Sequence, residues 1–146
     1  MPFLRPKIYK YTTELRWTER HKGILSFEGK RDIEIGCPPE FGGEYGVWSP
    51  EELFVASVNI CIMTTFLDLI DKKKGEILSY ESRAIGKACL VLEEKRFRFI
   101  GVDVYPVIKV KEENRRIAEE AIERAAEECM VSNSLKFKPE VRYKIV

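Results

Sequence analysis

Four cysteines, Cys37, Cys61, Cys89 and Cys129, are the residues of this chain best suited to chemistry, and they accompany a single histidine, His21. The cysteines form no Cys-x-x-Cys pair and have no histidine at metal-ligand spacing, so a metal site is not expected and no cofactor is predicted. A Ser-His-Asp or Cys-His centre would have to use His21, which falls in an expected loop without a nucleophile elbow. We therefore interpret His21 as a surface residue and expect any chemistry to be that of thiols.

Cys61 and Cys129 fall on expected helices, and for each of them the plain alternative is packing in the core. Cys61 lies within an apolar helix. Cys129 ends the apolar stripe of a second helix, where the partial negative charge of a helix C-terminus disfavours a thiolate. Cys129 is therefore a poor first nucleophile, although it can resolve a sulfenic acid formed on another cysteine. Cys37 and Cys89 are interpreted as structural.

The first of these helices has clear start and stop signals. Ser49 is a good N-cap, Pro50 suits the first helical position, and Glu52 completes a capping box. The helix is expected to run to the lysines at 72–74, whose charges favour a helix C-terminus, with Gly75 as its left-handed stop.

The other elements follow from hydrophobic periodicity and turn residues. Strands are expected at 7–18, 23–27, 30–35, 80–92, 96–110 and 140–146, and a second, amphipathic helix at 112–129. Pro106 predicts a bend or an edge position in its strand, and the loop at 37–43 is not expected to hold regular structure. The predicted fold class is α+β, with a curved antiparallel sheet and two main helices in a single domain spanning 1–146.

Composition indicates a globular chain: of 146 residues, 45% are hydrophobic and 34% are charged. A net charge of +1 gives no strong electrostatic footprint for nucleic acid. Residues 1–10 lack the apolar segment of a signal peptide, and the longest uncharged stretch, 53–67, is shorter than a membrane helix. We expect a cytoplasmic protein that binds neither nucleic acid nor membrane. The absence of Gln and the abundance of Glu, Lys and Arg are typical of heat-adapted proteins.

Three features together resemble the OsmC/Ohr family of peroxide-detoxifying proteins. The first is Phe41-Gly42-Gly43 leading into Ser49-Pro50-Glu51-Glu52-Leu53-Phe54 and then Cys61, and the second is Cys129-Met130-Val131-Ser132-Asn133-Ser134-Leu135. The third is the order of elements, with three strands before the long helix. The likeness covers nearly the whole chain, and the two motifs are a specific combination.

The resemblance implies a role for each of the residues that carry it. Cys61 corresponds to the family's peroxidatic cysteine, Cys129 to its resolving cysteine, and Glu51 to its active-site carboxylate. An arginine from the N-terminal strands normally completes the site, and we assign Arg20 first and Arg16 second.

The resemblance also implies a reaction. A peroxide loses its distal oxygen to Cys61, Cys129 condenses with the resulting sulfenic acid, and an external dithiol reduces the disulfide. Because the helix N-terminus lies about three turns from Cys61, an arginine held by Glu51 is expected to stabilise the thiolate. Met130 stands where related proteins often have Pro, and the Phe-Gly-Gly loop is more similar to the general OsmC-like branch. Both organic hydroperoxides and hydrogen peroxide therefore stay open as substrates.

Glu51 and Cys61 are ten residues apart on one helix, hence about 15 Å apart along its axis. An antiparallel pair of these helices from two copies would bring Glu51 of one toward Cys61 of the other. Residues 54–70 are apolar on nearly every face, which predicts burial on all sides, in the chain's own core or against another copy. We therefore expect an intertwined homodimer with its sites at the interface.

Two other functions fit the residues. One is a non-catalytic domain whose cysteines only pack or form a static disulfide. The other is a binding module that holds a small apolar ligand beside Met63 and Phe66.

Overall fold

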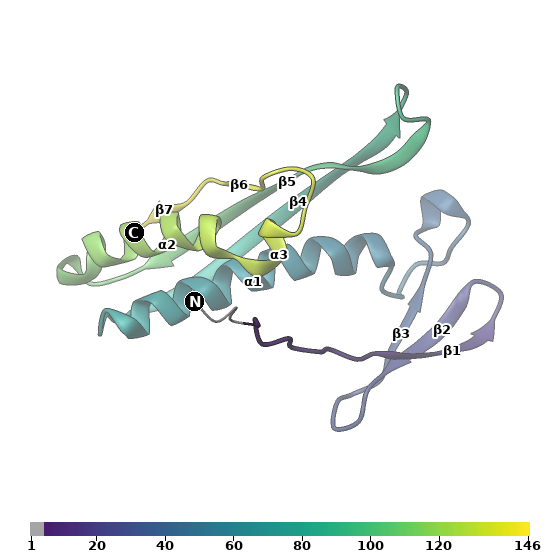
Figure 1. Ribbon diagram of the computed structural model, residues 1–146, viewed down its shortest axis with the longest axis horizontal. Coiled ribbons are helices and arrows are strands. Elements are labelled where there is room, and N and C mark those ends of the chain that lie inside the picture. The colour runs from purple at the N-terminus through teal and green to yellow at the C-terminus, as the bar shows by residue number, and fades with distance from the viewer. Residues whose placement is uncertain (1–4) are drawn as a thin grey trace. The chain divides into compact units, whose positions relative to one another are not determined.

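The computed structural model describes residues 5–146, which form two compact units (Figure 1). Unit 1 ends at Glu52 and unit 2 comprises Leu53–Val146. The class is α+β, as predicted, with two main helices. The strands form two sheets rather than the one sheet expected, and whether the units make up a single domain stays a prediction.

Unit 1 contains an antiparallel sheet of three strands, ordered β1 (Glu14–Glu19), β2 (Lys22–Ser26) and β3 (Ile33–Gly36). The three predicted N-terminal strands are therefore confirmed, although the first is half its expected length. The loop that follows was expected to be irregular, but it holds a single 3₁₀ turn, η1 (Pro39–Phe41). Proline fixes the backbone angle φ near the value that such a turn needs, which explains this difference.

Hydrogen bonds before and within the first turn fix the start of helix α1 (Pro50–Lys72). Trp48 pairs with β3 through two backbone hydrogen bonds, and Ser49 follows directly. The Glu52 amide donates to the Ser49 hydroxyl at 3.1 Å, while the Ser49 amide donates to the Glu52 carboxylate at 3.2 Å. The predicted capping box is thereby confirmed.

The end of α1 is a Schellman motif, with one correction to the expected stop. The Gly75 amide bonds the carbonyl of Ile70, and the Lys74 amide bonds that of Asp71. The left-handed residue is Lys74, with φ of 55°, not Gly75. Gly75 instead lies in close packing, where an added Cβ would lie 3.1 Å from the side chain of Ile117.

Unit 2 is built on a long antiparallel hairpin of β4 (Ser79–Val91) and β5 (Arg96–Lys109), whose tip projects beyond the helices α2 and α3 described below (Figure 1). The expected C-terminal strand is split into β6 (Glu140–Val141) and β7 (Lys144–Ile145), and both pair with β5 in parallel. This sheet is therefore mixed rather than purely antiparallel.

Pro106 explains the split of the C-terminal strand. The carbonyls of Val104 and Ile108 accept hydrogen bonds from the C-terminal segment, so the nitrogen of Pro106 faces that segment too. Proline has no N–H to donate. It therefore lies opposite the break between β6 and β7, within a strand whose other edge is paired with β4 throughout.

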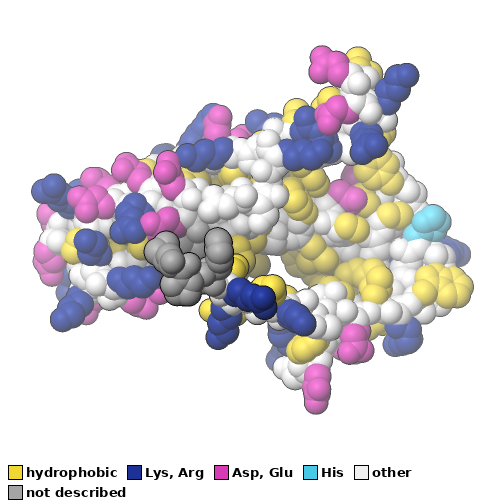
Figure 2. All heavy atoms as spheres, viewed as in Figure 1, with side chains coloured by type: hydrophobic (Ala, Val, Ile, Leu, Met, Phe, Trp, Pro, Cys, Tyr) yellow, Lys and Arg dark blue, Asp and Glu magenta, His cyan; other side chains and the backbone are white. Residues whose placement is uncertain are grey.

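The second main helix, α2 (Arg115–Glu128), is shorter than the expected 112–129. A 3₁₀ turn, η2 (Glu112–Asn114), precedes it, and the four-residue helix α3 (Met130–Asn133) follows Cys129. The outer face of α2 carries several ion pairs at i, i+4 spacing, and acidic and basic side chains are mixed over this part of the surface (Figure 2).

The core of unit 2 lies between α1, β5 and α2. Its buried residues are Val58, Ile62, Phe66, Leu69, Ile70, Val102, Val104, Ile108, Ala118, Ala121, Ile122, Ala125 and Cys129. Only one face of α1 is buried within the chain, and Ile60 on another face is 56% exposed. The expectation of burial on all sides is therefore wrong for a single chain, which leaves apolar surface on α1 to be explained.

Candidate active site

Cys61 lies in the middle of α1, in unit 2, where its side chain is half-buried. One helical turn further on, the Thr65 hydroxyl lies 4.0 Å from the Cys61 sulfur, at hydrogen-bonding distance for sulfur. The neighbouring Thr64 hydroxyl is turned away from the sulfur and donates to the Cys61 carbonyl at 3.2 Å. Thr65 therefore has the hydroxyl that can form a hydrogen bond with the Cys61 sulfur.

Cys129 occupies the single residue between α2 and α3 and is fully buried in the core of unit 2. It has extended backbone angles, so the chain turns there from one helix to the next. Its amide closes the last turn of α2 by bonding Ala125, and its carbonyl accepts the amide of Asn133 in α3. Cys129 thus lies at the C-terminal end of α2, as the sequence predicted, and is also the N-cap residue of α3.

The two sulfurs interact with each other, and their pKa values move in opposite directions. Burial raises the pKa of the Cys61 thiol, but hydrogen bonds from Cys129, the Val131 amide, the Thr65 hydroxyl and the Met130 amide together outweigh it, so the net pKa is lowered. Burial raises the pKa of Cys129 first, and the hydrogen bond to Cys61 raises it further. The pair therefore favours the thiolate on Cys61 over the thiolate on Cys129.

Sequence analysis did not predict several of the groups that form hydrogen bonds to the Cys61 sulfur. Besides the amide of Val131, the amide of Met130 and the Thr65 hydroxyl also lower its pKa. The amides belong to the first turn of α3, where N–H groups have no carbonyl partner within the helix. The sequence did not reveal these amides, because the N-cap of α3 is Cys129, a residue not typical of that position. The Cys61–Thr65 spacing, by contrast, was readable as one helical turn.

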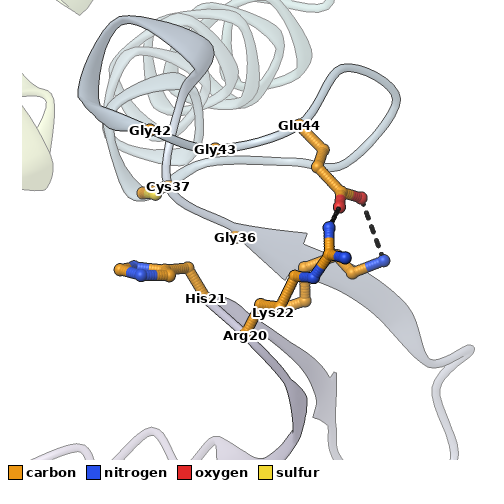
Figure 3. Close-up of a pocket in the computed structure, with 8 residues that line it drawn as sticks. All are labelled: Arg20, His21, Lys22, Gly36, Cys37, Gly42, Gly43 and Glu44. Carbon is orange, nitrogen blue, oxygen red and sulfur yellow. Dashed lines mark hydrogen bonds and ion pairs between the residues drawn. The ribbon is translucent and has the colours of Figure 1, made fainter.

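Arg20 and Arg16 belong to unit 1. Arg20 follows β1 with a φ of 49°, and its guanidinium pairs with the Glu44 carboxylate at 3.3 Å. The same carboxylate binds Lys22 at 3.0 Å, and Figure 3 shows it directed at both cations. Arg16 lies on the exposed strand β1. Arg20 therefore has a carboxylate partner of its own, which sequence reasoning did not find.

Glu51 stands at the second position of α1, at the end of unit 1. Its Oε2 is buried and has no hydrogen-bond partner among residues 5–146. A buried carboxylate oxygen without a donor is costly to leave unpaired, so this atom is suited to receive a cation or another donor.

A pocket of about 500 Å³ opens in unit 1 beside these charges. It is lined by Arg20, His21, Lys22, Gly36, Cys37, Gly42, Gly43 and Glu44 (Figure 3). His21 is exposed, as predicted, and Cys37 is half-buried with its thiol 3.6 Å from the Phe41 carbonyl. Cys89 is exposed on β4, so the expectation that it packs on the sheet is wrong.

The remaining side chains near Cys61 are structural. The Ser82 hydroxyl of β4 donates to Asn59 of α1 at 2.6 Å, which fixes the helix on the sheet two residues before Cys61. Phe66 is fully buried and its ring lies 5.5 Å from that of Tyr80. Within residues 5–146, no three His, Cys, Asp or Glu side chains are grouped so that they could hold a metal ion.

Comparison with known proteins agrees with this arrangement of strands and helices. The sequence profile of the family described as OsmC-like protein matches residues 42–144. This range is more than half of the chain and includes Cys61 and Cys129. The chain belongs to the OsmC-like family. No curated protein matches it.

Solved OsmC-like structures share the fold at low identity. An OsmC-like protein of unknown function from Vibrio cholerae is 20% identical, with a TM-score of 0.81 over 95% of this chain and 100% of that one. An organic hydroperoxide resistance protein from Legionella pneumophila is 24% identical, with a TM-score of 0.71 over 92% and 96%. Another from Elizabethkingia anophelis is 23% identical, with a TM-score of 0.69 over 94% and 96%.

Proposed function

We propose that this OsmC-like protein is a thiol-dependent peroxidase that reduces organic hydroperoxides, hydrogen peroxide or both. The observation that carries the proposal is the asymmetric pair of Cys61 and Cys129, whose interaction favours the thiolate on the half-buried sulfur and the thiol on the buried one. The thiolate is the nucleophilic form of cysteine. The names of the Legionella and Elizabethkingia proteins support the same class of substrate.

The proposed reaction begins with attack of the Cys61 thiolate on the distal peroxide oxygen. The O–O bond breaks, Cys61 becomes a sulfenic acid, and the proximal oxygen leaves as an alcohol or water after taking up a proton. The Cys129 sulfur then attacks the Cys61 sulfur and expels water, which closes the disulfide. An external dithiol reduces this disulfide and is itself oxidised. The interaction of the two thiols favours disulfide formation over further oxidation.

Glu51 and an arginine are proposed to complete the site. The unpaired buried oxygen of Glu51 is suited to hold a guanidinium, which would stabilise the negative charge that develops on the leaving peroxide oxygen. Arg20 is the first choice and Arg16 the second, although Arg20 would have to share its charge with Glu44. The donors to Cys61 within unit 2 reduce the need for an arginine to form the thiolate.

The test is a single addition of cumene hydroperoxide or hydrogen peroxide to the reduced protein, followed by acid quenching and intact mass measurement. The proposal predicts the loss of two hydrogens per chain at one equivalent of peroxide, with peptide mapping to Cys61–Cys129. Cys129→Ser should instead gain oxygen at Cys61, because the sulfenic acid has no partner. Cys89→Ser, which removes an exposed thiol, is the matched control and should behave as the unchanged protein. If both thiols stay reduced at stoichiometric peroxide, the protein is not a peroxidase.

We also propose that the protein is a homodimer in the cytoplasm. The apolar surface of α1 that its own chain leaves uncovered, including Ile60, supports a second copy as its cover. By length and composition alone α1 is also long enough to cross a membrane, but core helices of soluble proteins meet that test too. Its contribution of five buried residues to the core of unit 2 favours the soluble alternative.

A further inference from the structure

Ser132 is the hydroxyl that the proposed mechanism leaves without a role. It lies in α3, three residues after Cys129, and is 7% exposed. Its Oγ is buried and has no hydrogen-bond partner among residues 5–146. Buried hydroxyls are normally hydrogen-bonded, because an unmade bond costs about 1–3 kcal/mol. A buried hydroxyl without a partner next to a redox cysteine therefore needs an explanation.

Two other serine hydroxyls, one within α1 and one directly after α3, each bond a carbonyl of the preceding turn. Ser57 and Ser134 each donate to a carbonyl three or four residues earlier, at 2.7 Å and 2.9 Å. The Ser132 hydroxyl makes no such bond to an earlier carbonyl. It is therefore free to turn toward the Cys129 sulfur, whose pKa this hydroxyl and the Ser132 amide lower.

The need for such a donor arises when the disulfide is reduced. Cys129 is fully buried whereas Cys61 is half-buried, so the reductant reaches the Cys61 sulfur first. Its thiolate attacks that sulfur and forms a mixed disulfide, while the electron pair of the broken S–S bond passes to Cys129. A thiolate then forms in the core, away from water, where charge is costly unless a donor is present. A better stabilised leaving thiolate departs faster.

We propose that the Ser132 hydroxyl donates a hydrogen bond to the Cys129 sulfur as that sulfur becomes negatively charged, and that it thereby speeds reduction of the Cys61–Cys129 disulfide by the external dithiol. In the reduced form the Cys129 sulfur carries no charge, and the buried hydroxyl makes no well-formed hydrogen bond. The second thiol of the dithiol then displaces Cys61, which leaves the oxidised reductant and two cysteines that take up their protons from water. The inference rests on the proposed disulfide between these two cysteines.

The experiment forms the disulfide with diamide rather than a peroxide, in a Cys37→Ser, Cys89→Ser background, so that it does not depend on peroxidase activity. The rate constant for reduction by dithiothreitol is then measured by quenching, alkylation and mass. Ser132→Ala should slow reduction about tenfold, the value of a hydrogen bond to a charged group. Ser132→Thr, which keeps the hydroxyl, should restore most of the rate. Ser134→Ala, which removes a neighbouring hydroxyl bonded elsewhere, should leave it unchanged.

Thermal unfolding of each variant shows that the fold is intact. Ser132→Val, which has the shape of the threonine variant without its hydroxyl, replaces Ser132→Ala if the alanine variant does not fold. The inference is wrong if Ser132→Ala is reduced as fast as Ser134→Ala, or if Ser132→Thr is as slow as Ser132→Ala. Failure of peroxides to oxidise the unchanged protein would overturn the proposed peroxidase but not this result. A protein that diamide cannot convert to the Cys61–Cys129 disulfide would overturn both.

Discussion

At the scale of single residues, the chemistry of Cys61 depends on donors that neighbouring turns supply. The Thr65 hydroxyl lies 4.0 Å from the sulfur and lowers the pKa of Cys61, together with the larger effects of Cys129 and the Val131 amide. The half-buried position opposes these donors, because burial raises that pKa. Each lost donor should therefore shift Cys61 toward the unreactive thiol at neutral pH.

Thr65→Val tests this balance, since it removes the hydroxyl and keeps the shape of the side chain. We expect a higher pKa for Cys61, measured by thiolate absorbance at 240 nm against pH in a Cys37→Ser, Cys89→Ser background. The rate constant with peroxide at neutral pH should fall roughly 3- to 10-fold, the value of one hydrogen bond. Thr64→Val is the matched control, because its hydroxyl bonds a carbonyl. Equal pKa values for the two variants would contradict the assignment.

The sequence predicted Cys61 and Cys129 as candidate site residues, but it did not predict which groups surround them. Cys61 and Cys129 were singled out because motifs at fixed spacing surround them, and helix periodicity indicated which side chains share a turn. The sequence could not predict that a second helix begins directly after Cys129, because the N-cap of α3 is this cysteine and not a Ser, Thr, Asp or Asn. The pairing of Arg20 with Glu44 was also missed, since 24 residues separate them and only the folded loop brings them together.

At the scale of elements, α1 packs on β4 through a position where no side chain fits. A Cβ added at Gly86 would lie 2.4 Å from Cγ2 of Val55 and 2.8 Å from the ring of Phe99. The Phe54 and Phe99 rings stack beside this contact at 4.4 Å between centroids. Gly86 thus allows the helix that carries Cys61 to approach the sheet closely.

Gly86→Ala should destabilise the protein by about 1–3 kcal/mol, because the rigid neighbours must shift to admit a methyl group. Chemical denaturation followed by circular dichroism measures the change. Gly101→Ala is the control on the partner strand, where the nearest atom is the flexible end of Lys87 at 3.8 Å. The packing argument fails if both substitutions cost the same free energy of unfolding.

Local signals predicted the ends of the elements better than their pairing. The Ser49–Glu52 capping box was readable because four consecutive residues carry it. The parallel pairing of β6 and β7 with β5 was not, since it joins segments more than thirty residues apart. The stop of α1 was misplaced by one residue, because Lys74 rather than Gly75 adopts the left-handed backbone conformation.

At the scale of the whole molecule, the uncovered apolar surface of α1 and the position of Glu51 point to the same arrangement. Glu51 and Cys61 are ten residues apart on α1, about 15 Å along the axis, so one chain does not easily bring both to one peroxide. Two copies related by a twofold axis would pair each glutamate with the other copy's cysteine, and would also cover the exposed side chain of Ile60. The proposed dimer would therefore complete the site and cover apolar surface at the same time.

Mixing two inactive variants distinguishes a shared site from one within a single chain. Glu51→Gln and Cys61→Ser should each lose most peroxidase activity, since each lacks one half of every site. When the two are unfolded and refolded together, random pairing should restore about a quarter of the sites, because half of the dimers are mixed and each has one intact site. Refolded mixtures of Cys61→Ser with Cys129→Ser are the control, because both cysteines of a site come from one chain and no activity should return. If the first mixture also stays inactive while sedimentation shows mixed dimers, Glu51 and Cys61 act within one chain and the proposed interface site is wrong.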